Sequence, residues 1–204
     1  MPPTNPVRRR ALTDAAIGLL ASSGVHGLTH RAVEKAAGLP PGTASNYFRS
    51  REELLVATAE RIAELHHAGT ERAAGPHHAG TGWRVSLVDL LTESLLAAAT
   101  TLRDRYLAIF ELQLEAVRRP ALAAALGGLQ DMAAQITAGQ HDGLGLAVPR
   151  ERIPALIALY GGALFTLVTA PPGSVGRDAV RHLVQVIVHG CAGPDGSDGP
   201  GGGR

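Results

Sequence analysis

The apolar residues of this chain recur at the spacing of an α-helix, and this pattern constrains the fold more than any other feature of the sequence. In the first such stretch, Leu12, Ala15, Ala16, Leu19 and Leu20 stand at positions i, i+3, i+4, i+7 and i+8, which is one face of a helix. Val, Ile and Thr do not alternate with polar residues over any long stretch. Aromatic residues, which strands favour, make up only 3% of the chain. We therefore predict an all-α protein.

Capping residues, glycines and prolines divide this pattern into separate helices. A first helix of about residues 8–22 is expected to end at Gly24, in a left-handed conformation. Thr29 is expected to cap a second helix, and Ser50 a fourth, where Glu53 completes a capping box. The sequence then predicts further helices in the ranges 29–36, 41–48, 50–74, 83–102, 103–118, 120–141, 151–170 and 177–190.

Charge is unevenly distributed along the 204 residues, whose formal net charge is +1. Residues 1–51 contain seven basic and two acidic side chains, and the remainder contains twelve basic and sixteen acidic, so the two parts carry +5 and −4. A basic segment can be an ordinary solvated surface, but it is also typical of a protein that meets a polyanion. Charge alone leaves both interpretations open.

The second and third expected helices are short and are joined by a tight turn at residues 37–39. Such a pair is either an ordinary helical hairpin or a helix-turn-helix, whose second helix enters the major groove of DNA. The hydrogen-bonding side chains of the third helix are Thr43, Ser45, Asn46 and Tyr47, and the arginines around it are Arg31, Arg49 and Arg51. These groups suit base edges and phosphates, which favours the helix-turn-helix.

The run LTHRAVEKAAGLPPGTASNYFRSREELLVA, residues 28–57, resembles the signature of the TetR family of transcriptional regulators. The matching features are a threonine-capped helix, an AAG turn, Gly-Thr at the start of the next helix, Tyr-Phe at its end and a basic residue opening the fourth helix. Including the preceding helix, the resemblance covers about residues 8–60. It implies an N-terminal three-helix helix-turn-helix domain, followed by a helical domain that binds a ligand and dimerises.

Carried over position by position, the resemblance implies which residues contact DNA. Thr29 would bind a phosphate while capping its helix, and Arg31 would reach a guanine, whose O6 and N7 suit the arginine fork. Tyr47 and Arg51 would hold phosphates, with Arg51 in the place of a more frequent lysine. The residues expected at the groove are Pro41, Gly42, Thr43, Ser45 and Asn46.

The third helix also departs from the family pattern. Ala44-Ser45 stand where many members have a bulky pair such as Leu-Tyr, and Asn46 stands where an aromatic residue is frequent. Asn46 can instead read an adenine through two hydrogen bonds, so the operator sequence does not follow from the resemblance. The residues expected in the core rather than at DNA are Val33, Leu39, Phe48 and Leu54, and the inward face of the second helix is expected at Ala32, Val33 and Ala36.

Residues 61–190 resemble the regulatory domain of the family only in layout. The resemblance implies that the last two helices form a four-helix bundle with those of a second copy, which would set two recognition helices one DNA turn, about 34 Å, apart. The apolar residues that agree with such a homodimer are Leu156, Leu159, Tyr160, Ala163, Leu167, Leu183, Val184, Ile187 and Val188. Gly161 and Gly162 would permit a close approach of helices.

The resemblance also implies a cavity for a small-molecule effector. The candidate lining residues are Trp83, Tyr106, Phe110, Gln113, Met132, Gln135 and Phe165. A few polar groups among apolar walls are typical of such a pocket, but they are also typical of a plain helical core, which is the commoner case. Both interpretations stay open for each of these residues.

Residues 153–175 contain no charged side chain, and a run of that length raises the question of a membrane span. Pro154, the Gly161-Gly162 pair and residues 171–173 (Pro-Pro-Gly) interrupt it. A helix that is apolar all round is also typical of one buried between a core and a partner subunit. We expect no membrane span.

Other functional classes find little support in the sequence. It has no glycine-rich phosphate loop, nucleophile elbow or paired carboxylates, so we expect neither an enzyme nor a cofactor. The adjacent histidines at 66–67 would point about 100° apart on a helix, those at 77–78 fall in an expected loop, and no clustered Cys or carboxylate joins them, which argues against a metal site. The single Cys191 indicates a reducing compartment, and the first ten residues have no hydrophobic run typical of a secretory signal. We expect a cytoplasmic, bacterial protein.

The sequence thus predicts a DNA-binding domain at residues 1–52, an effector-binding and dimerisation domain at 53–191, and a disordered Gly/Pro/Asp-rich tail at 192–204. Its expected partners are double-stranded DNA, a second copy of the chain and a small-molecule effector. The function that follows is a ligand-responsive repressor that acts as a homodimer on a palindromic operator. The effector would move the fourth helix and change the spacing of the two recognition helices.

Overall fold

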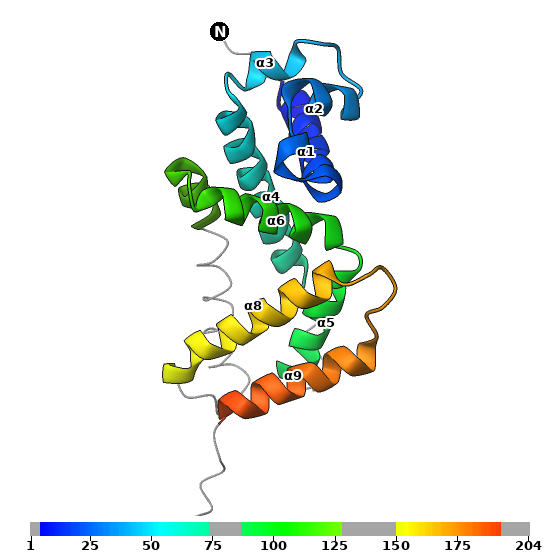
Figure 1. Cartoon of the computed structure of the whole chain (residues 1–204), viewed down its shortest axis with the longest axis vertical. Coiled ribbons are helices and arrows are strands. Elements are labelled where there is room, and N and C mark those ends of the chain that lie inside the picture. The colour runs from blue at the N-terminus through cyan, green and yellow to red at the C-terminus, as the bar shows by residue number, and fades with distance from the viewer. Residues whose placement is uncertain (1–4, 74–86, 128–149, 193–204) are drawn as a thin grey trace, which may run out of the picture. The chain divides into compact units, whose positions relative to one another are not determined.

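The computed structural model describes residues 5–73, 87–127 and 150–192 (Figure 1). These residues form helices and turns with no strand among them, which confirms the all-α prediction. The elements are α1 (Pro6–Gly27), α2 (His30–Ala36), α3 (Thr43–Tyr47), α4 (Arg51–Ala73), α5 (Leu87–Ala99), α6 (Arg103–Ala116), the 3₁₀ turn η2 (Arg150–Arg152), α8 (Ile153–Thr169) and α9 (Arg177–Ala192). Residues 120–127 are helical as well. The expected tail lies almost wholly outside the described residues.

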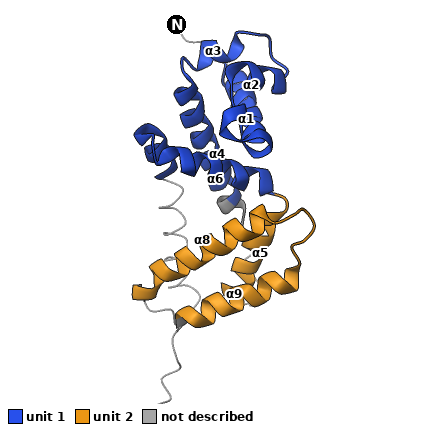
Figure 2. Cartoon of the chain, viewed as in Figure 1, with its two compact units in different colours: residues 1–82, 102–132 blue, residues 83–101, 133–204 orange. Residues whose placement is uncertain are grey.

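The chain divides into two compact units, each of which combines two separate segments of the sequence (Figure 2). Unit 1 comprises residues 1–82 and 102–132, and unit 2 comprises residues 83–101 and 133–204. Helix α5 therefore belongs to unit 2, although α4 and α6 on either side of it in sequence belong to unit 1. The expected domain boundary at residues 52–53 stays a prediction.

The core of unit 1 is built around α1, which packs against α2, α4 and α6. Leu12, Ala16 and Leu20 stand four residues apart and are buried, as expected of one helical face. Of the expected core residues near α3, Val33 and Leu54 are fully buried, Phe48 is nearly so, and Leu39 packs against the same cluster. The core assignment of these residues is confirmed. Ala36, expected on the inward side of α2, is exposed instead.

Both ends of α1 differ in detail from the sequence prediction. The helix begins at Pro6 rather than Arg8, because the Asn5 side chain accepts hydrogen bonds from the amides of Val7 and Arg8 and Pro6 stands in the first turn. At the other end Gly24 has a φ of 64° and a ψ of −176°. The positive φ agrees with the prediction, but the ψ lies outside the left-handed helical region. A last helical turn continues to Gly27.

The start of α4 forms the expected cap with one change. The Ser50 Oγ accepts a hydrogen bond from the Glu53 amide at 3.1 Å, as in a capping box. The Glu53 carboxylate accepts from the amide of Arg49 at 2.6 Å and so reaches one residue beyond the cap. Both bonds fix the direction in which the chain leaves α3 and enters α4.

Unit 2 is formed by α5, α8 and α9, which pack against one another around an apolar core (Figure 1). Its most deeply buried members are Leu95, Val180 and Val184, and Cys191 is also buried in it. Arg177 pairs with Glu93, and Arg181 with Asp89, so that two exposed ion pairs join α9 to α5. None of the described helices combines the length and the hydrophobicity that a membrane span requires.

Candidate nucleic-acid interface

The turn between α2 and α3 depends on two glycines with positive φ. Gly38 has a φ of 64° and Gly42 a φ of 84°, a region that other residues rarely adopt. The amide of Leu39 donates to the Glu34 carbonyl at 2.9 Å, and the amide of Gly38 donates to the Lys35 carbonyl at 3.2 Å. These two bonds form a Schellman motif, which ends α2 and turns the chain sharply.

Helix α3 begins at Thr43 and not at the expected Pro41, because the left-handed Gly42 stands between Pro41 and the helix. The helix has no side-chain cap of its own at its N-terminus. The Thr43 hydroxyl donates to the Pro40 carbonyl at 2.6 Å. The Ala44 amide donates instead to a carboxylate oxygen (Oε1) of Glu34 on α2, at 2.7 Å.

The other end of α3 is also bonded to α2. The Nε2 atom of His30 lies 2.8 Å from the carbonyl oxygen of Phe48, the residue that follows α3. Neither His30 nor Glu34 was among the site residues expected from the sequence. The signal was present, because the two stand four residues apart on one helix and Glu34 is one of only two acidic side chains in residues 1–51.

One face of α3 is turned to solvent and carries polar groups. Ser45 and Asn46 are exposed, and Tyr47 is half-buried beside Phe48, with 6.4 Å between the ring centroids. Ala44 is fully buried, so the small residue at this departure from the family pattern belongs to the core. Pro41 and Gly42 are exposed in the turn before the helix, and Thr43 is half-buried. The expected groove residues therefore lie together on one short segment.

Thr29 and Arg31 flank this face from the start of α2. The Thr29 Oγ1 accepts a hydrogen bond from the Ala32 amide at 3.1 Å, which confirms its capping role. Its contact with a phosphate stays a prediction. Arg31 is exposed and has no hydrogen bond or ion pair within the described part of the chain, so its guanidinium is available to a partner.

Arg51 is placed differently from Arg31. Its Nε donates to the Leu28 carbonyl at 3.1 Å, and a terminal nitrogen donates to the Val25 carbonyl. The side chain is half-buried and ties the start of α4 to the connection between α1 and α2. The expected phosphate contact of Arg51 stays a prediction, and it would use the donors that these two carbonyls leave unoccupied.

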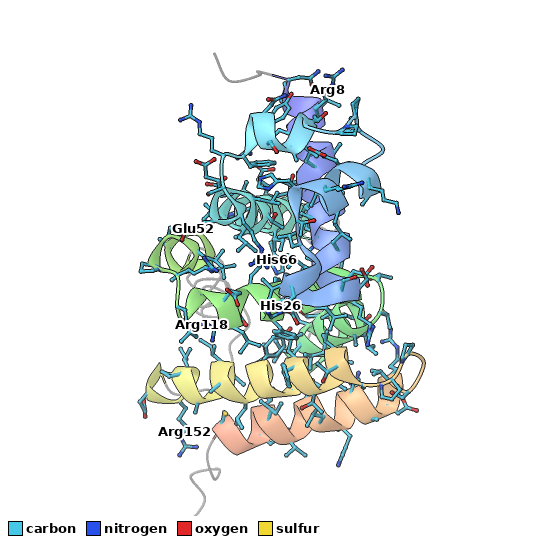
Figure 3. The ribbon with its side chains drawn as sticks, turned by 45° about the horizontal axis from the view of Figure 1, so that its top comes forward. Arg8, His26, Glu52, His66, Arg118 and Arg152 are labelled. Atoms are coloured by element: carbon cyan, nitrogen blue, oxygen red, sulfur yellow. The ribbon has the colours of Figure 1, made fainter. Side chains whose placement is uncertain are left out.

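The two acidic side chains of residues 1–51 are paired or buried, whereas Glu52 and Glu53 at the start of α4 are exposed. Asp14 pairs with Arg61 at 2.8 Å, and the Glu34 carboxylate is buried against the α3 N-terminus. Arg8 lies at the end of α1 that is near α3 (Figures 1 and 3). The cations of residues 1–51 that are exposed are Arg8, Arg9, Arg10, Arg31, Lys35 and Arg49. Arg9 lies over the Phe48 ring, 5.7 Å from its centroid, and pairs with Glu60.

The expected effector-pocket residues that the structure describes are divided between the two units. Tyr106, Phe110 and Gln113 all stand on α6 in unit 1, where Gln113 is exposed and the other two are half-buried. Phe165 stands on α8 in unit 2 and is 52% exposed. Trp83, Met132 and Gln135 lie outside the described residues. The pocket assignment therefore stays a prediction for all seven.

Tyr106 forms a contact in unit 1 that the sequence did not predict. Its hydroxyl lies 3.4 Å from Nε2 of His66 on α4, and the two rings meet edge to face with centroids 5.6 Å apart. Figure 3 shows His66 within the side chains of unit 1. Burial, assisted by the nearby charges of Arg105 and His67, lowers the pKa of His66, and burial raises the pKa of the Tyr106 hydroxyl. Both shifts in pKa favour the neutral form of the group.

A short helix that is presented by a glycine-containing turn and surrounded by exposed cations defines a helix-turn-helix protein. Residues 12–58 match the family model of bacterial regulatory proteins of the tetR family, and residues 83–190 match that of the tetracyclin repressor-like C-terminal domain. The chain belongs to the TetR family, and it is a DNA-binding transcriptional regulator. Because this is a family of regulators, the prediction that the protein is not an enzyme is confirmed.

Individual relatives support the same assignment. Over 53 residues the chain is 43% identical to the HTH-type transcriptional regulator BetI of Rhizobium meliloti (strain 1021), a match that spans 26% of each chain. The chain therefore covers about a quarter of that relative's length. A TetR-family protein from Streptomyces coelicolor A3 is 26% identical with a TM-score of 0.66, covering 89% of this chain and 98% of that one. The multidrug binding protein EbrR complexed with ethidium is 27% identical with a TM-score of 0.63, covering 88% and 98%.

Proposed function

We propose that this regulator is a ligand-responsive repressor that binds a two-fold-symmetric operator as a homodimer. The observation that carries the proposal is the exposed face of α3, where Ser45 and Asn46 project from a helix fixed at both ends. In a helix-turn-helix such a face enters the major groove. The exposed Arg49 follows the helix directly, and Arg9 lies over the ring of Phe48. Of the two carboxylates in residues 1–51, Asp14 is paired and Glu34 is buried.

The side chains divide into base readers and backbone contacts. Arg31 has an available guanidinium, which suits guanine O6 and N7, and the amide of Asn46 suits adenine N6 and N7. Thr29, Tyr47 and Arg51 are proposed to contact phosphates, which set the position of the protein on the duplex but carry no sequence information. Pro41, Gly42, Thr43 and Ser45 would lie along the groove.

The proposed homodimer rests on the surface of unit 2. Helix α8 has no charged residue, yet part of it faces solvent in the single chain: Leu159 is 51% exposed and Phe165 52%. On α9, Val186 is 57% exposed. Gly161 and Gly162 are exposed, with open space where a Cβ would stand, which permits close approach of another helix. A second copy that covers these residues would remove apolar surface from water.

Most of the apolar residues that were expected to face the partner do not contribute to this surface. Leu156, Ala163, Val184, Ile187 and Val188 are buried within unit 2 of one chain. They pack α8 and α9 against each other and against α5. The proposed dimer surface is therefore smaller than the sequence suggested, and it consists of Leu159, Phe165, Val186 and the small residues between them.

A small-molecule effector is proposed because EbrR, a similar structure, is a multidrug binding protein that has been complexed with ethidium, proflavin and malachite green. An effector changes DNA binding only if it has different affinities for the DNA-competent and incompetent states. Coupling free energies of about 1–3 kcal/mol are typical. The carboxylate of Glu111 on α6 accepts a hydrogen bond from the Val25 amide at 2.8 Å, and this contact offers a path from α6 to α1.

The test is selection of bound fragments from bacterial genomic DNA by the purified full chain at two salt concentrations. We expect a palindromic site whose half-site centres lie about ten base pairs apart. Binding that is sensitive to salt but independent of sequence would contradict the proposed operator. Purified complexes of the selected site then allow a screen for compounds that release the protein.

A further inference from the structure

Helix α3 is too short to hold its own conformation. It has five residues, and Gly42 at its N-terminus provides no side-chain cap. Isolated helices shorter than about 12 residues are marginal in water, so the geometry of α3 must come from its surroundings. The proposed function requires that geometry to be kept, because α3 is the segment that would read the bases.

Two side chains from one face of α2 supply the missing bonds at the two ends of α3. His30 and Glu34 stand four residues apart and therefore lie one above the other on the same side of the helix. The Glu34 carboxylate accepts from the Ala44 amide at 2.7 Å in the first turn of α3. His30 bonds to the Phe48 carbonyl at 2.8 Å immediately after the last turn. One helix thus holds both ends of the other.

We propose that His30 and Glu34 are positioning residues for DNA recognition, which set the orientation of α3 without contacting DNA. The inference rests on the proposed function, in which α3 reads the operator. Glu34 suits this role chemically, because a carboxylate at a helix N-terminus is favoured by the helix dipole and forms a charge-assisted hydrogen bond. With 5% of its surface exposed, its carboxylate is directed at the α3 N-terminus and not at solvent.

The burial of Glu34 is difficult to explain by stability alone. No cation among the described residues forms an ion pair with it, and a buried charge without such a pair is costly unless hydrogen bonds satisfy it. A residue that served only as core would be apolar at this site, as its neighbour Val33 is. The carboxylate instead caps α3 from a neighbouring helix, because it accepts from the Ala44 amide and Gly42 has no side chain that could do so.

The experiment uses the full chain and two pairs of variants. Glu34→Gln keeps an oxygen that can accept from Ala44, whereas Glu34→Met keeps the length of the side chain without an acceptor. His30→Gln places an amide nitrogen near the position of Nε2, whereas His30→Asn is too short to reach Phe48. For each variant, the Kd is measured for the selected operator and for a scrambled duplex of equal length, at one salt concentration and well below the Tm.

We expect Glu34→Met and His30→Asn to lower the ratio of specific to non-specific affinity, each on the order of tenfold, the usual effect of removing one partner of a buried hydrogen bond. Glu34→Gln and His30→Gln should retain the ratio within about threefold. Hydrogen exchange adds a measurement that needs no DNA. The Ala44 amide should exchange faster in Glu34→Met, and it should stay protected in Glu34→Gln.

Thr58→Val is the matched control, because the Thr58 hydroxyl is buried in the same unit and, among the described residues, bonds only to the Leu54 carbonyl of its own helix, at 2.7 Å. Its loss should lower the Tm and leave the affinity ratio unchanged. If Glu34→Met lowered the Tm but kept the ratio, or if Thr58→Val lowered the ratio as much, the positioning role would be wrong. If the unmodified chain preferred no DNA sequence while Ala44 exchange still responded to Glu34→Met, the proposed function would fail and the bond between the helices would stand.

Discussion

The exposed faces of α3 and α8 are opposite in chemistry, although both belong to helices that face solvent in the single chain. Helix α3 has five residues and presents hydroxyl and amide groups among exposed cations. Helix α8 has 17 residues, no charge, and two large apolar side chains that are about half exposed. The first surface suits a hydrated, negatively charged partner, and the second suits an apolar one.

The two surfaces are also supported differently. The orientation of α3 depends on individual hydrogen bonds from Glu34 and His30, so a single lost acceptor can change it. The orientation of α8 depends on a core to which many apolar side chains contribute, among them Leu156 and Ala163, so single exposed substitutions should leave the fold intact. Substitutions at α3 and its supporting residues therefore test how precisely α3 is oriented. Substitutions on the exposed face of α8 test whether two copies of the chain associate.

The largest effect is expected from Phe165→Glu on α8. A carboxylate that is buried between two copies costs several kcal/mol for each ion, so the dissociation constant of the dimer should rise by at least about a hundredfold. Analytical ultracentrifugation measures this constant directly. Val117→Glu is the control, because Val117 is 82% exposed in unit 1 and should leave the dimer unchanged. A dimer of normal strength in Phe165→Glu would exclude this face as the interface.

The next effect concerns base reading by Arg31. Arg31→Ala should cost about 1–3 kcal/mol of binding free energy and relax the preference at one base pair of each half-site. Arg31→Lys keeps the charge but not the planar fork, so it should recover non-specific affinity without the base preference. Titration of operators that are substituted at each position measures both quantities. A uniform loss over all sequences would instead place Arg31 at a phosphate.

A smaller effect on DNA binding is expected at Arg51, and it separates two roles of one side chain. If Arg51 contacts a phosphate, Arg51→Ala should weaken all sequences alike and lower the salt slope by about one. Its bonds to the Val25 and Leu28 carbonyls predict in addition a lower free energy of unfolding. A destabilised variant whose salt slope is unchanged would assign Arg51 to the carbonyls alone.

The smallest effect is a pH dependence of the stability of unit 1. Burial lowers the pKa of His66 in the folded chain, so the unfolded chain takes up a proton at higher pH. The free energy of unfolding should therefore fall as the pH drops below about 6.5, the ordinary histidine value, and the loss should level off below the lowered pKa. In urea unfolding between pH 5 and 8, His66→Gln should remove this component. His26→Gln, at an exposed position, should retain it, and identical profiles for both variants would contradict the assignment.

Local signals in the sequence predicted most of the helices. The Thr29 and Ser50 caps formed as expected, because a cap depends only on residues within one turn. The start of α6 at Arg103 and of α9 at Arg177 agrees with the ranges 103–118 and 177–190 for the same reason. The polar character of α3 could also be predicted from the sequence, since its residues are contiguous in the chain.

Contacts between residues far apart in the sequence could not be predicted from such local signals. The bond from Arg51 to the Val25 carbonyl joins residues 26 positions apart, and no local pattern distinguishes it from a phosphate contact. The burial of Glu34 in place of Ala36 depends on where α3 lies. Periodicity identified α8 and α9 as rich in apolar residues. It could not show which of these residues are buried in the core of unit 2 and which could face a partner.

The return of α6 to unit 1 bears on how the chain folds. The carboxylate of Glu111 meets the Val25 amide across 86 residues of sequence, and Ala108 and Leu112 on the same helix complete the core around α1. Contacts that close so long a loop carry an entropic cost and slow folding. A fragment that ends after α4 would contain every residue proposed to contact DNA, yet it would lack this part of its core. Grafting residues 1–52 onto another protein should therefore not be enough to transfer DNA recognition. A chimera would also have to include α6.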